Sequence, residues 1–275
     1  MDTELKMGIT DLPVSVFDDI QTEIWWYSVG LLKYKNHNEG EDENVNLIGS
    51  GTLIELDGFY GILTAQHVTA LLKNDYKLGL TIKDQVHRNS WDGRHLEIHE
   101  IAKPVDPALG PDLAIIILPK GQIGSLKAVK SFYNLSQNKN IIEEAEPEFD
   151  RGVWVLFGCL EEGAVEKRDV NGFFSVKGFN CIFGLAPIKK FYFTDSYDYY
   201  EVGVKYGHDP TIPGSFGGMS GGGLWQVRLI KMKNGDIKIK KPILSGVAFY
   251  QTDIINGIRY IKCHGRQSIY NLNLK

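Results

Sequence analysis

Three side chains in the sequence are of the types that cleave an acyl bond when they meet. His67 lies in the run GILTAQHV, Asp112 precedes the apolar run LAIIIL, and Ser220 lies within GGMSGGGLW. A serine hydroxyl becomes a good nucleophile when a neighbouring neutral imidazole takes its proton. A carboxylate at the start of a buried strand is costly unless it is hydrogen-bonded, which favours a histidine partner for Asp112. Together these residues indicate nucleophilic catalysis by Ser220.

The glycines around Ser220 indicate a turn of fixed geometry. The stretch GSFGGMSGGGLW contains six glycines. An oxyanion that develops during acyl transfer needs preorganised backbone N–H donors, and glycine permits the unusual torsions and close substrate approach that such a turn requires. We therefore interpret the glycine content as a requirement of geometry.

In chain order, the stretches TAQHV, DLAI and GMSGG resemble the motifs of the trypsin-like serine peptidases, whose catalytic residues follow in the order His, Asp, Ser. The resemblance extends from about Trp25 to the end of the chain. It implies that Ser220 is the nucleophile, that His67 acts first as base and then as acid, and that Asp112 orients His67. It also implies an oxyanion hole made by the backbone N–H groups of Gly218 and Ser220.

The same resemblance locates a pocket for the substrate side chain next to the scissile bond. Its floor is expected near Gly214, and one wall is expected along the run AFYQ, at Ala248, Phe249, Tyr250 and Gln251. No acid stands at the floor position, so we expect a small or apolar side chain there rather than Arg or Lys. An acid close by in the sequence would overturn this expectation, and the two candidates are Asp209 and Asp253.

Two residues depart from the pattern of the secreted digestive members. Met219 stands where those enzymes have an Asp that pairs with a newly cut N-terminal amine, and Gly223 stands where Pro is usual. The first change closes that activation route, and we expect the second to loosen the turn. The chain therefore resembles an intracellular, bacterial-type branch, and we expect a regulatory protein partner to order the site.

The expected function is that of a serine endopeptidase acting on a protein or peptide substrate. The alternative is a catalytically weak or inactive peptide-binding module on the same fold. The departures at Met219 and Gly223 give this alternative some support. Hydrolysis of esters or thioesters by the same three residues is a third, narrower option. The triad residues favour the peptidase.

Strand signals dominate the rest of the sequence, as short β-branched and aromatic runs broken by Gly, Asp and Asn. With the resemblance, they predict an all-β fold of two six-stranded antiparallel β-barrels of chymotrypsin type, with the active site in the cleft between them and a short C-terminal helix in GRQSIYNLNLK. The expected organisation is an N-terminal extension (1–20), a first barrel (21–135), an interdomain linker (136–150) and a second barrel with the helix (151–275). Asn234 and Gly235 predict a hairpin with a two-residue turn.

Composition excludes several classes of function. The formal charge is −4, which gives no reason to expect a nucleic-acid partner, and no apolar run reaches the roughly 20 residues that cross a bilayer. The acidic N-terminus lacks the features of a secretory signal, so we expect a cytoplasmic protein. Cys159, Cys181 and Cys263 show no paired motif, and we expect them to be reduced and buried.

No metal or cofactor is expected. His95 and His99 are four residues apart, a spacing that can bind a metal on a helix, but apolar and polar residues alternate around them as in a strand. No glycine-rich loop follows the strand-turn-helix pattern that binds nucleotide phosphates.

Overall fold

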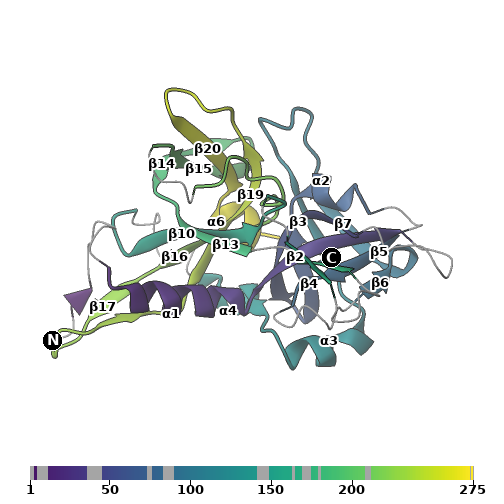
Figure 1. Ribbon diagram of the computed structural model, residues 1–275, viewed down its shortest axis with the longest axis horizontal. Helices are drawn as coiled ribbons and strands as arrows, with labels where there is room; N and C mark the ends of the chain where they lie inside the picture. Colours follow the sequence, from purple (N-terminus) through teal and green to yellow (C-terminus); the bar gives the residue numbers. More distant parts are fainter. Residues whose placement is uncertain are drawn as a thin grey trace.

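The chain folds into two curled antiparallel sheets, one from each half of the sequence, as the computed structural model shows (Figure 1). The structure describes residues 3–4, 12–35, 45–72, 76–82, 90–140, 149–162, 165–168, 175–178, 181–207, 212–272 and 274. Within these residues the architecture is the all-β, two-barrel fold of chymotrypsin type expected from the sequence.

The first sheet has eight strands in the described part of the chain, with the order β6-β5-β2-β3-β4-β8-β7, and β9 pairs with β3 off this path. Its elements are β2 (Ser28–Lys35), β3 (Val45–Leu56), β4 (Phe59–Thr64), α2 (Gln66–Thr69), β5 (Tyr76–Leu80), β6 (Ser90–Asp92), the 3-10 turn η2 (Gly93–His95), β7 (Glu97–Ala102), β8 (Leu113–Ile117), α3 (Lys120–Lys127), β9 (Tyr133–Asn134) and α4 (Leu135–Asn138). All six strands expected in this half are present. The additional two, β6 and β9, are short.

The second sheet has seven described strands in the order β13-β10-β16-β19-β20-β15-β14. Its elements are β10 (Val153–Cys159), β13 (Cys181–Leu185), β14 (Ile188–Thr194), β15 (Tyr197–Lys205), β16 (Gly223–Val227), β19 (Ile243–Gln251), β20 (Ile258–His264) and the expected C-terminal helix α6 (Arg266–Tyr270). Outside it lie the pair β11 (Val165–Arg168) and β12 (Ser175–Gly178), and a three-stranded sheet of β1 (Thr3–Glu4), β17 (Leu229–Lys231) and β18 (Ile237–Ile239).

One hydrophobic core joins the two halves. It contains Ile54 and Ile115 from the first sheet together with Val155 and Trp225 from the second, all at most 1% exposed. The ring of Trp225 also packs edge-on against Tyr133, with centroids 5.4 Å apart. Because the apolar contact is continuous, the two sheets hold each other in place.

The N-terminal segment contains a helix that the sequence analysis did not predict. Helix α1 (Val14–Trp25) buries Val16, Ile20 and Ile24 along one face in the shared core. The helix extends beyond residue 20, where we expected the first barrel to begin, and ends at Trp25. The i, i+4 spacing of these three side chains was the available signal. The central part of the expected linker, residues 141–148, lies outside the described residues, so the domain boundaries stay a prediction.

The expected hairpin at Asn234 and Gly235 forms, but its turn is not a two-residue turn. The strands pair up to Lys231 and Ile237, and the Met232 N–H donates to the carbonyl of Asp236 at 2.7 Å. Gly235 has a φ of 93°, which supplies the left-handed residue that ends a longer loop.

The expectation of three reduced cysteines is wrong. Cys159 is disulfide-bonded, and Cys263 is a free buried cysteine. The register of β10 and β13 places Cys181 directly opposite Cys159. Cross-strand neighbours need no sequence motif to meet, which is why spacing along the chain gave no signal.

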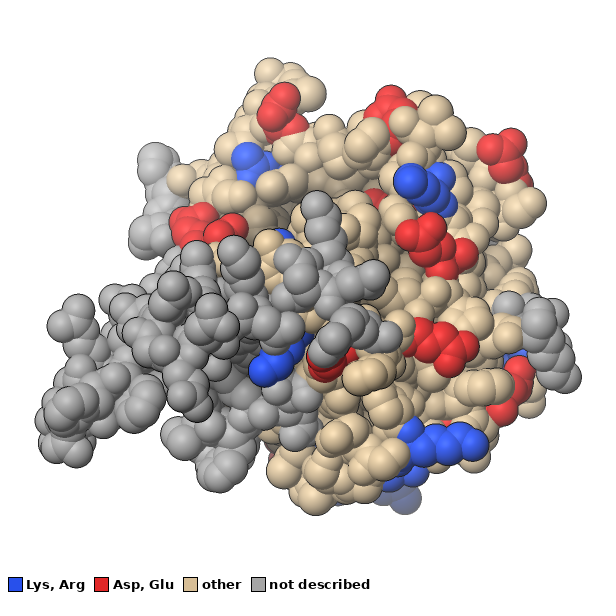
Figure 2. Space-filling model, turned by 90° about the vertical axis from the view of Figure 1, so that its right-hand side faces the viewer, with Lys and Arg blue, Asp and Glu red and all other residues tan. Residues whose placement is uncertain are grey.

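The described surface and helices show neither a large charged patch on the face in Figure 2 nor a helix that could span a bilayer. Lysine, arginine and acidic side chains are interspersed on the described part of the face in Figure 2, with no large patch of one sign. No described helix is both long and apolar enough to cross a bilayer.

The C-terminal end of α1 is held by Lys130. Its Nζ donates to the carbonyls of Trp25 at 2.7 Å and Ser28 at 2.9 Å, and the residue is only 3% exposed. The next residue, Ser131, donates its N–H to the Trp26 carbonyl at 2.9 Å. The bonds to Trp25 and Trp26 satisfy carbonyls that a helix end leaves without intrahelical partners, and the bond to Ser28 connects Lys130 to the start of β2.

Replacing Lys130 with methionine should therefore lower the free energy of unfolding by about 2 kcal/mol, because two carbonyls lose their hydrogen-bond donor. Chemical denaturation of Lys130→Met and of Lys120→Met, which changes an exposed lysine at the start of α3, would measure this. Equal stability of the two variants would contradict the role of Lys130.

Candidate active site

His67 and Asp112 form a closely bonded pair on the first sheet. His67 lies on the short helix α2 directly after β4, and Asp112 directly precedes β8, which pairs with β4. The Nδ1 atom of His67 is 2.6 Å from one carboxylate oxygen of Asp112, and the backbone N–H of His67 donates to the other at 3.0 Å. Asp112 is 1% exposed, so the bonds compensate a buried carboxylate. The pair fixes the ring with its Nε2 atom free to accept a proton.

Ser220 shares a pocket with this pair. The pocket has a volume of about 510 Å³ and draws its lining from both halves of the chain: His67, Pro107, Asp112, Phe216, Gly217, Met219, Ser220, Ala248, Phe249, Tyr250, Gln251 and Ile261. The structure thus brings together the three residues that the sequence analysis selected as a triad, although 45 residues separate the first two and over 100 the last two.

The turn before Ser220 aims the N–H of Gly218 away from the protein's own acceptors. Gly218 has a φ of 90°, in the left-handed region that favours glycine. The carbonyl of Gly217 accepts a hydrogen bond from the N–H of Glu161 at 3.0 Å. Because C=O and N–H point in opposite directions across a trans peptide, this bond turns the Gly218 N–H to the other side.

The N–H of Ser220 is arranged in the same way. The carbonyl of Met219 accepts from the N–H of Gly222 at 2.7 Å, while the N–H of Met219 donates to Phe216 at 3.0 Å. Among the described residues, no acceptor bonds the N–H of Gly218 or of Ser220. Two unoccupied donors that flank a serine hydroxyl are what a developing oxyanion requires.

The expected specificity pocket is placed only in part. Ala248, Phe249 and Tyr250 line the cavity as expected, but Gly214 does not. Its N–H bonds Glu162 at 3.2 Å, and its carbonyl accepts from Arg259 at 2.7 Å.

Gln251, at the end of the expected wall, also lines the cavity. The sequence analysis did not select four other lining residues, which are Pro107, Phe216, Gly217 and Ile261. Strand register brings Gln251 and Ile261 opposite each other, and the Gln251 side chain accepts the Phe216 N–H at 3.0 Å. No pattern in the sequence marks that pairing. Of the two acids that would have changed the specificity expectation, Asp253 is exposed outside the lining and Asp209 lies outside the described residues.

A second histidine, His264 at the end of β20, is hydrogen-bonded to the backbone of Asp112. Its Nε2 accepts the backbone N–H of Asp112 at 2.9 Å, and its ring lies 5.1 Å from that of Tyr199 and 5.0 Å from that of Phe249. Burial lowers the pKa of His264 to about 4, against the opposing influence of the Asp112 charge. The ring is therefore neutral at physiological pH, with its proton on Nδ1. The sequence analysis did not select His264 because CHG carries no motif.

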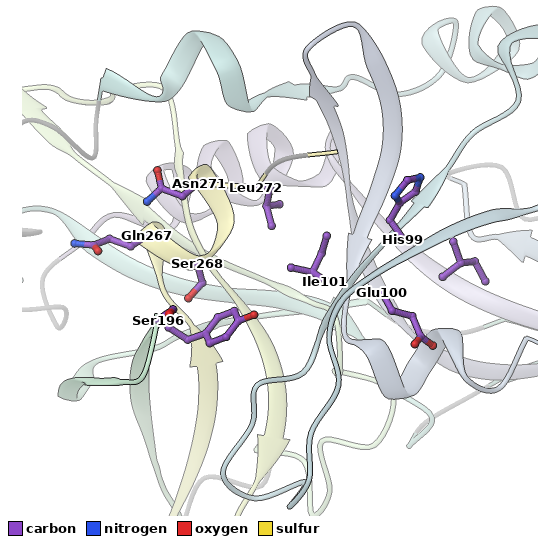
Figure 3. Close-up of a pocket in the computed structure, with 10 residues that line it drawn as sticks. His99, Glu100, Ile101, Ser196, Gln267, Ser268, Asn271 and Leu272 are labelled. Carbon is purple, nitrogen blue, oxygen red and sulfur yellow. The ribbon is translucent and has the colours of Figure 1, made fainter. Parts of the chain in front are cut away.

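A larger cavity of about 630 Å³ lies between β7 and α6 (Figure 3). Its labelled polar side chains form two groups, with Ile101 and Leu272 between them. One group contains His99 and Glu100, and the other contains Ser196, Gln267, Ser268 and Asn271. Several polar groups already have partners: Glu100 accepts from Gln66 at 2.8 Å, and the hydroxyl of Ser268 donates to Asp198 at 2.7 Å. This cavity lacks a set of convergent reactive groups.

The described residues contain no group of three His, Cys, Asp or Glu side chains placed to hold a metal ion. His99 lies in strand β7, as the alternating pattern indicated, and its Nε2 is 2.8 Å from a carboxylate oxygen of Glu97. His95 lies in the turn before that strand.

The two curled antiparallel sheets have the architecture of the chymotrypsin-like protease fold. No protein-family model matches the sequence, and neither does any curated protein. Similar solved structures include the active form of the Rv3671c protease from M. tuberculosis, with 17% identity over 91% of this chain and 81% of that chain and a TM-score of 0.44. Another is catalytically active tobacco etch virus protease complexed with product, with 13% identity, coverage of 88% and 74%, and a TM-score of 0.38.

The buried His264 predicts a specific dependence of stability on pH. The folded chain keeps this ring neutral down to about pH 4, whereas the unfolded chain protonates it near pH 6.5. His264 therefore makes no difference to the free energy of unfolding well above pH 6.5, and it lowers that free energy as the pH drops from 6.5 to about 4, by about 3 kcal/mol in total.

Chemical denaturation at several pH values would measure this loss in the wild type and in His264→Gln, whose amide oxygen can accept the Asp112 N–H without titrating. The difference in stability between the two proteins should change over this pH range. A constant difference would show that His264 does not contribute the dependence.

Proposed function

We propose that the protein is a serine endopeptidase that hydrolyses peptide bonds through Ser220, His67 and Asp112. The observation that carries the proposal is one pocket shared by Ser220 and a His67 whose ring and backbone are bonded to both oxygens of a buried carboxylate. The two free N–H groups of Gly218 and Ser220 support it, because they supply the oxyanion hole.

The chemistry follows from these positions. The hydroxyl of Ser220 attacks the substrate carbonyl carbon while His67 Nε2 takes the hydroxyl proton, and the carbonyl electron pair moves onto the oxygen. The N–H groups of Gly218 and Ser220 donate to that oxyanion. Collapse of the intermediate expels the amine, which receives the proton from His67, and an acyl-enzyme forms. Water then repeats the sequence and releases Ser220.

The substrate preference belongs to the same proposal. Phe216, Ala248 and Ile261 give the pocket apolar side chains, and its charged groups in the described part of the chain are those of the catalytic pair alone. An apolar or small substrate side chain therefore suits the pocket, and a basic one would lack a partner.

A regulatory partner remains part of the proposal, whereas the cytoplasmic location is now less well supported. Gating by a regulatory protein, and the bacterial-type branch with it, stay proposals based on Met219. A disulfide is rare in the cytoplasm, so the one at Cys159 counts against the cytoplasmic location that we expected.

Covalent labelling by a fluorophosphonate tests the catalytic proposal. We expect the purified wild type to gain the mass of one phosphonyl group, mapped to Ser220 by peptide mass spectrometry. Ser220→Ala should not react, and His67→Ala should react on the order of 1,000-fold more slowly. His99→Ala is the matched control and should react like the wild type, because His99 lies outside the pocket.

Each other result has a distinct meaning. A folded wild type that does not react, but that binds peptides as tightly as Ser220→Ala does, would contradict the peptidase and favour the peptide-binding module. Reaction in a cell lysate with none in the purified protein would support gating by a partner, and equal rates would contradict gating. Faster turnover of matched esters with no cleavage of amides would replace the peptidase with an esterase.

A further inference from the structure

We infer that Ser50 is a positioning residue that holds the oxyanion turn of the proposed peptidase from the opposite sheet. Ser50 lies in β3 of the first sheet, is 1% exposed, and bonds the turn through both its side chain and its backbone. The inference rests on the proposed function, because it assigns a task to Ser50 in the same reaction.

The hydroxyl of Ser50 is oriented by two strong hydrogen bonds. It accepts the N–H of Cys159 at 2.8 Å and donates to the carbonyl of Gly218 at 2.7 Å. A hydroxyl has a single proton, and the competing Cys159 carbonyl is 3.5 Å away, so the proton belongs to the shorter bond with Gly218. The Ser50 side chain therefore fixes the peptide that follows Gly218.

The backbone of Ser50 fixes the peptide that follows Ser220. The N–H of Ser50 donates to the carbonyl of Ser220 at 2.7 Å. The carbonyl of Ser50 in turn accepts the hydroxyl of Thr64 at 2.7 Å, which holds β3 in place behind the contact. The donor, the acceptor and the hydroxyl of Ser50 are thus all in use.

Strand β3 and the turn approach so closely that no side chain fits between them. A Cβ on Gly221 would lie 2.0 Å from the carbonyl oxygen of Ser50, and one on Gly49 would lie 2.9 Å from that of Ser220. Gly221 has a φ of 86°, which itself favours glycine. The contact is therefore rigid, with little room for the turn to shift.

The turn points its carbonyls toward donors of the protein and the N–H groups of Gly218 and Ser220 away from them. The carbonyls of Gly217, Gly218, Met219 and Ser220 all accept hydrogen bonds from the protein, and Ser50 supplies two of the four donors. With these carbonyls held, the N–H groups of Gly218 and Ser220 stay available to substrate. Losing the Ser50 hydroxyl would release the peptide between the two donors.

The residue between the donors contributes packing without charge. Met219 is 2% exposed in an apolar cluster of the second sheet. A Cβ on Gly158 would lie 2.5 Å from its sulfur, so the side chain fills its space closely. Ser50 thus supplies the polar restraint on the turn, and Met219 supplies the apolar one.

The test compares Ser50→Ala with the wild type in steady-state cleavage of a peptide amide and in the rate of fluorophosphonate labelling. We expect kcat and the labelling rate to fall about 10- to 100-fold with little change in KM, because the oxyanion hole acts on the transition state. The affinity of a peptide aldehyde, whose adduct places an oxyanion in the hole, should fall by a similar factor. Thermal unfolding measures the cost to stability.

Ser28→Ala is the matched control. It removes another buried serine hydroxyl, which donates to the Ile24 carbonyl at 3.1 Å away from the pocket, and should leave kcat unchanged. Unchanged kcat and aldehyde affinity in a folded Ser50→Ala would overturn the inference and leave the proposed function intact. A folded wild type that reacts neither in purified form nor in a cell lysate would instead contradict the proposed function.

If Ser50→Ala does not fold, Ser50→Thr decides the matter, because it retains the hydroxyl. A folded Ser50→Thr with wild-type labelling would support the inference. Failure of both variants to fold would show that Ser50 serves packing between the sheets, and the positioning role would be wrong.

Discussion

The candidate active site is divided between two sheets, so its geometry depends on the backbone contact where they meet. His67 and Asp112 belong to the first sheet and Ser220 to the second, while the Ser50 N–H of β3 bonds the Ser220 carbonyl. A shift of even 1 Å between the sheets would misplace Ser220 relative to His67, and in the reaction that we propose such misplacement is costly. The continuous core behind this contact, with Trp225 at its centre, resists that shift.

Burial of Asp112 imposes a second constraint. A carboxylate that is 1% exposed needs donors, and the ring and backbone of His67 provide them. The backbone of Asp112 needs an acceptor as well, which His264 provides from β20 of the second sheet. The acid therefore connects the two halves a second time. His264 accepts that bond only when its ring is neutral, and burial keeps the ring neutral by lowering its pKa.

The sequence predicted the parts of this protein that depend on local pattern. Short β-branched and aromatic runs, broken by Gly, Asp and Asn, identified the strands. The motifs around His67, Asp112 and Ser220 identified residues that the fold brings to one pocket. The glycine turn was also interpreted correctly as a matter of geometry. Gly223 does not loosen it: that residue lies in β16, where a Cβ would be 2.4 Å from the Trp225 indole nitrogen.

The residues that the sequence did not reveal depend on register between distant strands. Ser50, His264 and Ile261 have no distinguishing motif, and each acquires its role from what lies opposite it in the folded chain. The Cys159 disulfide is of the same kind, since its strand neighbour is 22 residues away in the sequence. Gly214, the expected pocket floor, does not line the cavity for a related reason. Hydrogen bonds from its backbone to Glu162 and Arg259 hold it outside the cavity.

The chemical composition of the pocket connects these observations to the reaction. The oxyanion donors that we propose are backbone N–H groups, and the described lining has no acidic or basic side chains other than those of His67 and Asp112. Backbone dipoles carry no net charge and need no counter-ion, so they can be held in an apolar setting at little desolvation cost. They stabilise an oxyanion only if their direction is fixed before the reaction begins. Since Met219 offers no charge to fix it, the direction must come from hydrogen bonds to the turn carbonyls, and Ser50 makes two of these.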